Sequence, residues 1–276
     1  MTPVVWLDGV LLPEREARID PADRGFLLAD GVFETIRVGE GTIWHLGRHL
    51  ARLREGAQAL GLPVPVDDAG ISRAIRKLLT ANRLREGSLR LTLTAGRGRR
   101  GLARPNDLAP SLLISCTAPG PPLPPAALII AHTTRRNEHS PLSRIKALGY
   151  GDQILARREA AARGADDAIL LNGAGVMVCG SAANLLLHNG AEWLTPPVAD
   201  GALPGITRGL LIEAGLIRAR TLLSEDLAGA AQILLVNALG VRSVTRVGAR
   251  VFTPLPALVA PLLRAARDPD IVHRPF

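Results

Sequence analysis

Hydrophobic residues recur at two different spacings along this chain. Over 46–60 and again over 71–79 they return every three or four positions, which predicts two amphipathic helices. Over 89–94 leucine alternates with arginine or threonine, the period of a strand that buries one face. Two short apolar runs flank Asp8-Gly9, a dipeptide typical of a two-residue hairpin. The first part of the chain is therefore predicted to be α+β, with an antiparallel sheet.

A proline-rich segment interrupts these patterns at 118–125, where neither a helix nor a strand can be regular. Because 276 residues exceed the usual size of one domain, we expect a small N-terminal domain at 1–117, a linker at 118–126 and a larger C-terminal domain at 127–276. In the last of these, the patterns predict strands near 127–132, 167–171, 176–178 and 184–188, and helices at 152–163 and 206–216. The expected fold class is a two-domain α+β or α/β protein.

The charge balance is strongly basic, with a formal net charge of +8. The arginines are spread along the whole chain, and the densest group, at 96–101, lacks the interleaved aromatic residues that stack on bases. We therefore expect no nucleic-acid partner. A positive field of this kind equally suits a small anionic substrate or a phosphate-bearing cofactor.

The sequence also predicts a cytoplasmic location. No apolar run reaches the length of a membrane span, and the N-terminus shows no export pattern. Two cysteines, Cys116 and Cys179, give no disulfide framework. We expect no contact with a membrane and no metal site.

Lysine is rare in this chain, which makes each lysine informative. Of 33 basic residues, only Lys77 and Lys146 are lysine. Unlike arginine, a lysine amine can lose its proton and form an imine with an aldehyde. Lys77 lies in a predicted amphipathic helix and is interpreted as an ordinary solvated residue. Lys146 follows a turn-rich segment just before a predicted helix, so it is a candidate for binding pyridoxal phosphate, with a leftover surface lysine as the alternative.

A glycine before a predicted helix supplies a candidate phosphate site. Gly205 directly precedes the helix, so the amides of Ile206 and Thr207 lie at a helix N-terminus, where unpaired N–H groups and the helix dipole favour an anion. Arg52 lies between core-facing leucines of the first predicted helix and is the natural charged partner for a phosphate. Taken alone, these features are also compatible with an ordinary helix start and an ordinary surface arginine.

Together these segments resemble the class IV aminotransferase family of pyridoxal phosphate enzymes, also called fold type IV. The resemblance runs from about Val5 to Val247. It is carried by Asp23-Arg-Gly-Phe-Leu-Leu-Ala-Asp-Gly-Val-Phe-Glu-Thr-Ile-Arg37, His49-x-x-Arg-Leu53, Lys146 with Tyr150 and the helix containing Ala156 and Glu159-Ala160, Gly180-Ser-Ala-Ala-Asn184, Thr195-Pro-Pro, and Gly201-Ala-Leu-Pro-Gly-Ile-Thr-Arg208. It implies a fold like that of D-amino-acid aminotransferase, pyridoxal 5′-phosphate as the cofactor, and a homodimer.

The resemblance also implies roles for individual residues. Lys146 matches the lysine that forms the Schiff base, and Arg52 matches the arginine that binds the phosphate. Tyr150 matches a position near the cofactor, where a structural tyrosine is an equal alternative. The positions that match cofactor-binding positions of the family are Arg52, Lys146, Tyr150, Cys179, Ile206, Thr207, Asn237 and Ala238.

Within the family, the segments 25–38, 98–101 and 237–244 look most like 4-amino-4-deoxychorismate lyase. Such an enzyme releases pyruvate and 4-aminobenzoate for folate synthesis. Lys146 would be the catalytic residue that removes the α-proton of a small anionic, amino-acid-like substrate. The candidates for binding substrate carboxylates are Arg97, Arg99 and Arg100. The alternatives are a D-amino-acid or branched-chain type aminotransferase, and a family member that kept the fold and lost its chemistry.

One cofactor position departs from the family pattern. The family usually places a glutamate at the head of the segment 179–184, where it pairs with the pyridine nitrogen, and this chain has Cys179 there. A thiol, with a reference pKa of about 8.5, is normally neutral. No acidic residue lies between 168 and 191 to replace the glutamate. We favour a neutral thiol beside a neutral pyridine over a thiolate paired with a pyridinium, and expect this departure to slow transamination more than elimination.

Overall fold

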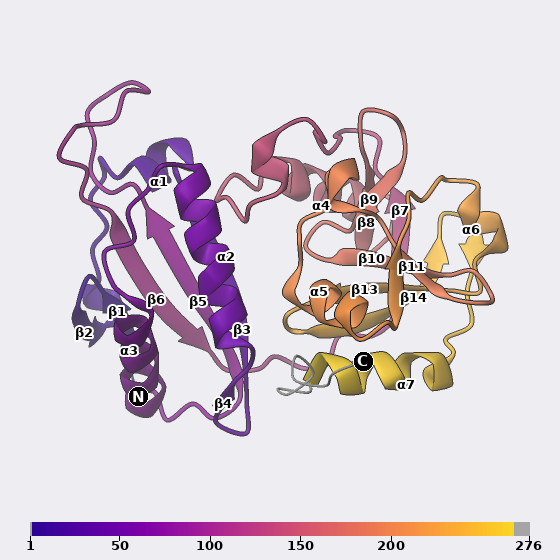
Figure 1. The fold of residues 1–276 in the computed structure, drawn as a ribbon, viewed down its shortest axis with the longest axis horizontal. Helices are drawn as coiled ribbons and strands as arrows, with labels where there is room; N and C mark the ends of the chain where they lie inside the picture. Colours follow the sequence, from indigo (N-terminus) through magenta and orange to yellow (C-terminus); the bar gives the residue numbers. More distant parts are fainter. Residues whose placement is uncertain (1, 268–276) are drawn as a thin grey trace. The chain divides into compact units, whose positions relative to one another are not determined.

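The protein is described by a computed structural model that covers residues 2–267. The chain forms two compact units, both drawn in Figure 1. Within the described residues, the first unit contains 2–121 together with Ile145–Gly149, and the second contains 122–144 and 150–267. Each unit is built on its own sheet.

The first unit contains a six-stranded sheet in the order β2-β1-β6-β5-β3-β4, and every neighbouring pair is antiparallel. Its strands are β1 (Val4–Leu7), β2 (Val10–Pro13), β3 (Gly31–Gly39), β4 (Thr42–Ile43), β5 (Gly87–Thr94) and β6 (Ser111–Thr117). The predicted hairpin at Asp8-Gly9 joins β1 to β2. Both turn residues have positive φ, 46° and 100°, as a tight turn between twisted strands requires.

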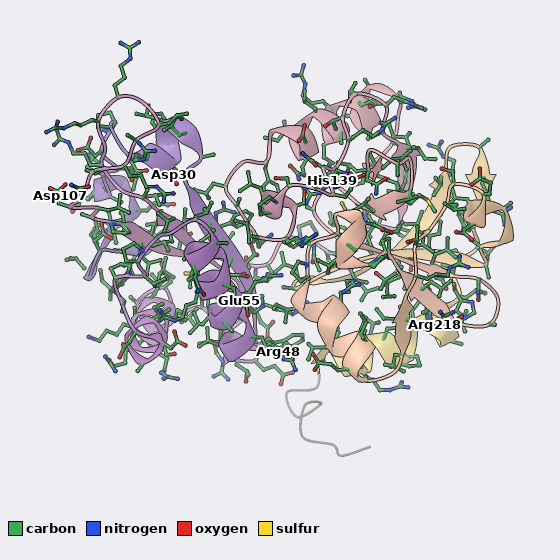
Figure 2. All side chains as sticks on the ribbon, turned by 45° about the horizontal axis from the view of Figure 1, so that its top comes forward. Asp30, Arg48, Glu55, Asp107, His139 and Arg218 are labelled. Carbon is green, nitrogen blue, oxygen red and sulfur yellow. The ribbon has the colours of Figure 1, made fainter. Side chains whose placement is uncertain are left out.

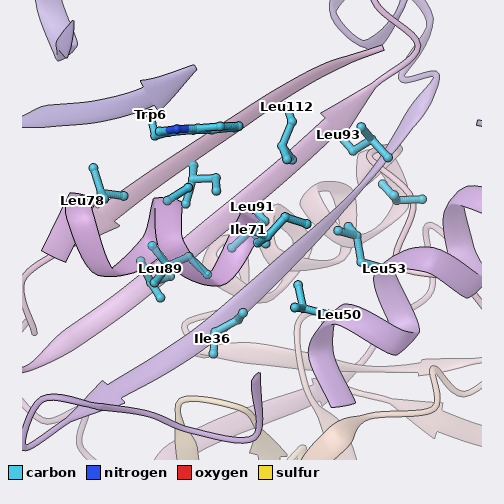
Figure 3. Close-up of a cluster of buried hydrophobic side chains, with 14 of the residues drawn as sticks. Trp6, Ile36, Leu50, Leu53, Ile71, Leu78, Leu89, Leu91, Leu93 and Leu112 are labelled. Carbon is cyan, nitrogen blue, oxygen red and sulfur yellow. The ribbon is translucent and has the colours of Figure 1, made fainter. Parts of the chain in front are cut away.

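Helices cover one face of this sheet and close the first core. The helices are α1 (Arg24–Leu28), α2 (Leu46–Ala59) and α3 (Asp68–Ala81), with a 3-10 turn at Glu14–Glu16. Asp67 caps α3 by accepting a 2.7 Å hydrogen bond from the Gly70 N–H. Figure 3 shows the buried side chains that the helices and strands contribute, among them Trp6, Ile36, Leu50, Leu53, Ile71, Leu78, Leu89, Leu91, Leu93 and Leu112. Each such side chain stabilises the fold by roughly 1.5–3 kcal/mol through its burial.

The second unit contains a mixed sheet in the order β12-β11-β10-β13-β14-β7-β8-β9, in which β9 also pairs with β10 and so closes a small barrel. Its strands are β7 (Ala126–Ile130), β8 (Asp167–Leu171), β9 (Met177–Cys179), β10 (Asn184–His188), β11 (Trp193–Thr195), β12 (Ile217–Ala219), β13 (Gln232–Asn237), β14 (Gly240–Val247) and β15 (Arg250–Val251). Its helices are α4 (Gly151–Ala162), α5 (Ile206–Glu213), α6 (Asp226–Gly229) and α7 (Pro256–Arg267), with 3-10 turns at Pro141–Ser143 and Val198–Asp200. Among residues 2–267, no helix is long and apolar enough to cross a membrane.

The units differ from the expected domains at one place that matters for function. The sequence-based division put all of 127–276 in the C-terminal domain, whereas Ile145–Gly149, which contains Lys146, groups with the first unit. This segment groups with the first unit because its backbone pairs with β3, where Ala147 forms an antiparallel bridge with Val32. Residues 118–125 have no helix or strand, and β7 begins at Ala126.

Candidate active site

The backbone around Lys146 is fixed by hydrogen bonds to β3. The Lys146 carbonyl accepts a hydrogen bond from the Phe33 N–H at 2.9 Å, and the Leu148 N–H donates to the Gly31 carbonyl at 3.0 Å. The Lys146 Nζ lies 4.2 Å from the centre of the Phe33 ring. A cation over an aromatic face is attracted by the ring quadrupole. The pairing with β3 therefore determines where the candidate catalytic amine lies in this unit.

The surroundings of Lys146 lower the pKa of its amine well below that of an ordinary lysine. The residue is half-buried, and burial lowers the pKa of its amine to about 8, with the charges of Arg52 and Arg90 acting in the same direction and Glu34 opposing them. Desolvation and like charges both disfavour the ammonium. An amine with a pKa close to the working pH can bind a carbonyl carbon and also exchange a proton with the substrate.

This shift gives the first testable expectation. In protein freed of cofactor, the reaction of Lys146 with an amine-directed acylating reagent should rise with pH and reach half its maximum near pH 8, because only the unprotonated amine reacts. Peptide mapping would follow the label at Lys146 from pH 6 to pH 10, with the Lys77 peptide as an internal reference for the reagent. A labelling curve centred above pH 10 would contradict the lowered pKa.

A buried charged cluster lies beside this segment. The carboxylate of Glu34, on β3, accepts two hydrogen bonds from Arg52, from Nε and from Nη2, each at 2.7 Å, and one from His49 Nδ1 at 2.7 Å. Glu34 and His49 are almost completely buried, and Arg52 is 9% exposed. Burial alone would raise the pKa of Glu34, but the hydrogen bonds from His49 and Arg52 outweigh it and lower that pKa. Burial lowers the pKa of His49, so the ring is neutral and Nδ1 carries the donated hydrogen.

Four further residues surround Lys146 or Arg52, and the sequence patterns alone assign them no role: Phe33, Glu34, His49 and Arg90. Arg90 stacks its guanidinium 4.0 Å from the centre of the Phe33 ring. One signal was present, since the alternation of β3 puts Glu34 on the core side together with Val32, Ile36 and Val38. A charged residue at a core position requires a buried partner.

The start of α5 has the expected features of an anion site. Gly205 is its N-cap and supplies no side-chain hydrogen bond to the first turn, which leaves the N–H groups of Ile206 and Thr207 without that partner. A Cβ on Gly205 would lie 2.0 Å from the Asn184 Oδ1, so only glycine permits this approach of the backbone. Thr207 Oγ1 donates to the Asn237 carbonyl at 2.9 Å, which ties the helix start to the turn that contains Asn237 and Ala238.

Cys179 is buried at the end of β9, in an apolar cluster that includes Ala168, Leu170 and Ala202. The pKa of its thiol is raised to about 11, mainly by burial. The charge of Asp167 adds to this increase, and the charge of Arg136 opposes it. The thiol is therefore neutral at physiological pH, which supports the neutral-thiol reading over the thiolate. Cys179 pairs with Asn184, whose amide donates to the Leu203 carbonyl at 2.9 Å, so it belongs to the same part of the second unit as the α5 site.

The remaining candidates lie elsewhere in their units. Tyr150 is half-buried and is the N-cap residue of α4. The side chains of Arg97, Arg99 and Arg100 are exposed on the loop between β5 and β6. The charges that act on Lys146 are those of Arg52, Glu34 and Arg90, rather than those of this loop.

The arginine-rich loop is anchored rather than free. Buried Arg24 donates to the carbonyls of Gly101 at 3.1 Å and Leu102 at 2.9 Å, and its Nε donates to Asp30 at 2.8 Å. Arg104 pairs with the same Asp30, which Figure 2 labels beside α1. The loop that presents the three exposed arginines is thus held at its base by the buried side chain of Arg24 and by the two ion pairs of Asp30.

The structure places most of the predicted cofactor residues in two groups. Lys146 and Arg52 share the charged cluster of the first unit, and Cys179, Ile206, Thr207, Asn237 and Ala238 lie around β9, the start of α5 and the turn after β13 in the second. A family model described as "Amino-transferase class IV" matches residues 31–247. The chain belongs to the class IV aminotransferase family. Members of this family and its structural neighbours bind pyridoxal 5′-phosphate, and the predicted fold type IV is confirmed.

Similar proteins fall on both sides of the division between aminotransferase and lyase. A protein of Methanocaldococcus jannaschii named "Putative branched-chain-amino-acid aminotransferase" is 32% identical over 212 residues, which cover 76% of this chain and 73% of that one. The aminodeoxychorismate lyase of Bacillus subtilis is 29% identical over 215 residues, covering 76% and 73%. The crystal structure of a branched-chain aminotransferase from Thermoproteus uzoniensis with norvaline has a TM-score of 0.87 at 28% identity, covering 96% of this chain and 93% of that one.

Proposed function

We propose that this chain is a pyridoxal 5′-phosphate-dependent aminotransferase that acts on small amino acids of the branched-chain or D-amino-acid type. The observation that carries the proposal is the half-buried Lys146 amine, with its pKa lowered to about 8, in a chain of the class IV family. The similarity to branched-chain aminotransferases supports the transfer reaction. A homodimer, which the sequence resemblance implies, is part of this proposal.

The second unit contains residues that fit the phosphate of the cofactor. The first turn of α5 has no side-chain cap, and its N-cap is a glycine with no room for a Cβ. A phosphate suits this helix start, and the N–H groups of Ile206 and Thr207 would hold it. Asn237 and Ala238 would line the same site, since Asn237 is tied to Thr207. The sequence resemblance assigns Arg52 to the phosphate as well, although two of its nitrogen atoms are engaged by Glu34. It also assigns Lys146 to the aldehyde carbon and Tyr150 to a position near the ring.

The cofactor supplies an electron sink that acidifies the α-proton of a bound amino acid. Lys146 Nζ is the group that takes this proton and returns it, because its pKa near 8 leaves both protonation states accessible at neutral pH. Phe33 limits the movement of the amine through its ring contact. The charges of Arg52 and Arg90 make the surroundings of Lys146 suited to an anionic substrate.

A second candidate function, 4-amino-4-deoxychorismate lyase, is favoured by Cys179. A neutral thiol in place of the family's glutamate provides no negative charge to stabilise a protonated pyridine ring. Elimination tolerates a weaker electron sink than transamination, because the leaving group removes the negative charge as it forms. The similarity to the lyase of Bacillus subtilis supports this candidate too.

A single pair of assays separates the two candidates. With saturating cofactor, the aminotransferase should form an amino acid from 2-oxoglutarate only when an amino donor such as leucine or D-alanine is present. The lyase should release pyruvate from 4-amino-4-deoxychorismate with no keto acid added.

The variant Cys179→Glu should raise the transfer activity relative to elimination, because it restores a charged partner for the ring. Cys116→Glu is the control for an added carboxylate. Pyruvate release without amino transfer in the wild type would overturn the leading proposal in favour of the second.

A further inference from the structure

Arg136 and Cys179 flank the same end of β8. Arg136 forms a parallel bridge with Asn172, the residue just after β8, and Cys179 pairs with Leu170 of β8. Asn172 and Leu170 are two residues apart, so Arg136 and Cys179 lie on opposite edges of the same end of this strand.

The segment 201–202 connects the Arg136 guanidinium to the apolar cluster that contains the Cys179 thiol. Arg136 donates from Nε and Nη2 to the Gly201 carbonyl at 3.2 Å, and from Nη2 to the Ser143 carbonyl at 2.9 Å. Ala202, the next residue, packs in the apolar cluster that contains Cys179. The guanidinium is therefore held by backbone carbonyls, with its charge acting on the thiol.

The acid whose charge acts on the Cys179 thiol is already engaged. Asp167, on β8, accepts hydrogen bonds on Oδ1 from the N–H groups of Ala168 at 2.8 Å and Ser181 at 3.2 Å. Its Oδ2 accepts one from Arg157 Nη1 at 3.1 Å. These contacts commit both oxygens to the backbone and to another arginine. Asp167 is thus poorly placed to act as the charge partner that the family's glutamate provides.

We propose that Arg136 and Cys179 together keep the ring nitrogen of bound pyridoxal 5′-phosphate unprotonated. This inference rests on the cofactor binding that the proposed function includes, and on the sequence resemblance, in which Cys179 occupies the position of the glutamate that pairs with the ring nitrogen. A fixed guanidinium opposes a second positive charge nearby, and a neutral thiol is a hydrogen-bond donor that suits a nitrogen lone pair. Arg136 then lowers the pKa of the ring nitrogen, whereas the family's glutamate raises it.

The consequence concerns which reaction the protein performs. A ring with an unprotonated nitrogen withdraws electrons less strongly than a pyridinium, so the carbanion at the substrate α-carbon is shorter-lived. Reactions that discharge this carbanion at once, by α-protonation or loss of a β-substituent, are favoured over proton transfer to the cofactor carbon. Arg136 would therefore help to set the ratio of elimination to transamination.

The protonation state can be read directly. The protein would be loaded with pyridoxal 5′-phosphate labelled with 15N in the ring, and its nitrogen chemical shift followed from pH 6 to pH 9. The expected result in the wild type is the shift of an unprotonated pyridine throughout this range. A pyridinium shift at neutral pH in the wild type overturns the inference.

Variants then assign the effect to Arg136. Cys179→Glu should raise the pKa of the ring nitrogen by about 1–3 units, as an adjacent opposite charge does. Arg136→Gln should raise it as well, whereas Arg136→Lys, which keeps the charge, should leave the wild-type spectrum unchanged. A Gln variant that binds cofactor with an unshifted ring nitrogen would remove Arg136 from the explanation and overturn its role.

Different results would refute the proposed function and the proposed protonation state of the ring nitrogen. If stoichiometric cofactor binding is absent by absorption, the proposed function fails and this inference with it. If the cofactor binds at Lys146 and the ring is protonated, the proposed function stands and only the inference fails. The wild-type spectrum alone can refute the inference, so the test does not depend on whether an Arg136 variant folds well.

Discussion

Replacing Lys146 with alanine is expected to reduce turnover by about 10²–10⁴-fold or more, because the group that accepts the α-proton is removed. The same change should leave the cofactor bound through non-covalent contacts alone. Borohydride reduction of the wild type followed by peptide mapping should place the cofactor on the peptide that contains Lys146, and the Lys146→Ala protein should carry no covalent cofactor after the same treatment.

Lys77 provides the matched control, since it is exposed on α3 and is the other lysine of the sequence. Lys77→Ala should retain both turnover and covalent attachment. If borohydride instead fixes the cofactor on Lys77, or if the Lys146→Ala protein keeps full activity, the assignment of Lys146 is wrong. A protein that binds cofactor covalently yet shows no activity with amino acids would keep the binding assignment and overturn the proposed reaction.

Replacing Glu34 with leucine is expected to destabilise the first unit by about 3–5 kcal/mol, because the buried guanidinium of Arg52 loses its carboxylate. The two 2.7 Å hydrogen bonds from Arg52 and the one from His49 are all lost in this variant. Urea unfolding can be followed by tryptophan fluorescence in a Trp193→Phe background, which leaves Trp6 and Trp44 of the first unit as reporters.

The size of the effect distinguishes a buried pair from an exposed one. Asp68→Asn removes the partner of Arg54 in an ion pair whose side chains are 53% and 37% exposed, and it should cost only about 0–1 kcal/mol. Adding Arg52→Met to Glu34→Leu should recover much of the lost stability, since no unpaired buried charge then remains. A Glu34→Leu variant as stable as Asp68→Asn would show that the cluster does not hold the unit together.

Glu34 also links stability to pH. Its pKa is lowered in the folded protein, because hydrogen bonds from His49 and Arg52 outweigh the effect of burial. A carboxyl group whose folded pKa lies below its unfolded value contributes stability above the unfolded pKa, and that contribution is lost as the pH falls through the folded pKa. The advantage of the wild type over Glu34→Leu should therefore shrink in acid.

Local patterns in the sequence were sufficient for most of the elements near the site. The three-to-four spacing of apolar residues predicted α2 and α3, and the alternation over 89–94 predicted β5. Asp8-Gly9 predicted the first hairpin, and the glycine before Ile206 predicted the start of α5. These features depend on residues a few positions apart, where periodicity, capping and turn geometry decide the conformation. The same helix ends at Glu213, earlier than the predicted 216, because Gly215 adopts a positive φ of 66°.

The chemistry was partly visible in the same way. The rarity of lysine singled out Lys146, and the order of several motifs indicated the family that the comparisons then showed. The local motifs favour a lyase, whereas the similarity to branched-chain aminotransferases favours an aminotransferase, and the lyase relative is nearly as similar. Local signatures separate such branches poorly because they report the shared cofactor more than the substrate.

The sequence by itself therefore determined the elements, the fold family and the candidate amine. Only the tertiary structure decided that Lys146 pairs with β3, that Glu34 binds Arg52 and His49, and that Arg136 and Cys179 flank the same end of β8. Each of these contacts joins residues that are distant in the sequence, through strand register and helix docking, and no local pattern encodes that register. The charges that set the protonation of Lys146 and Cys179 act through space, so they become known only when the fold has placed them.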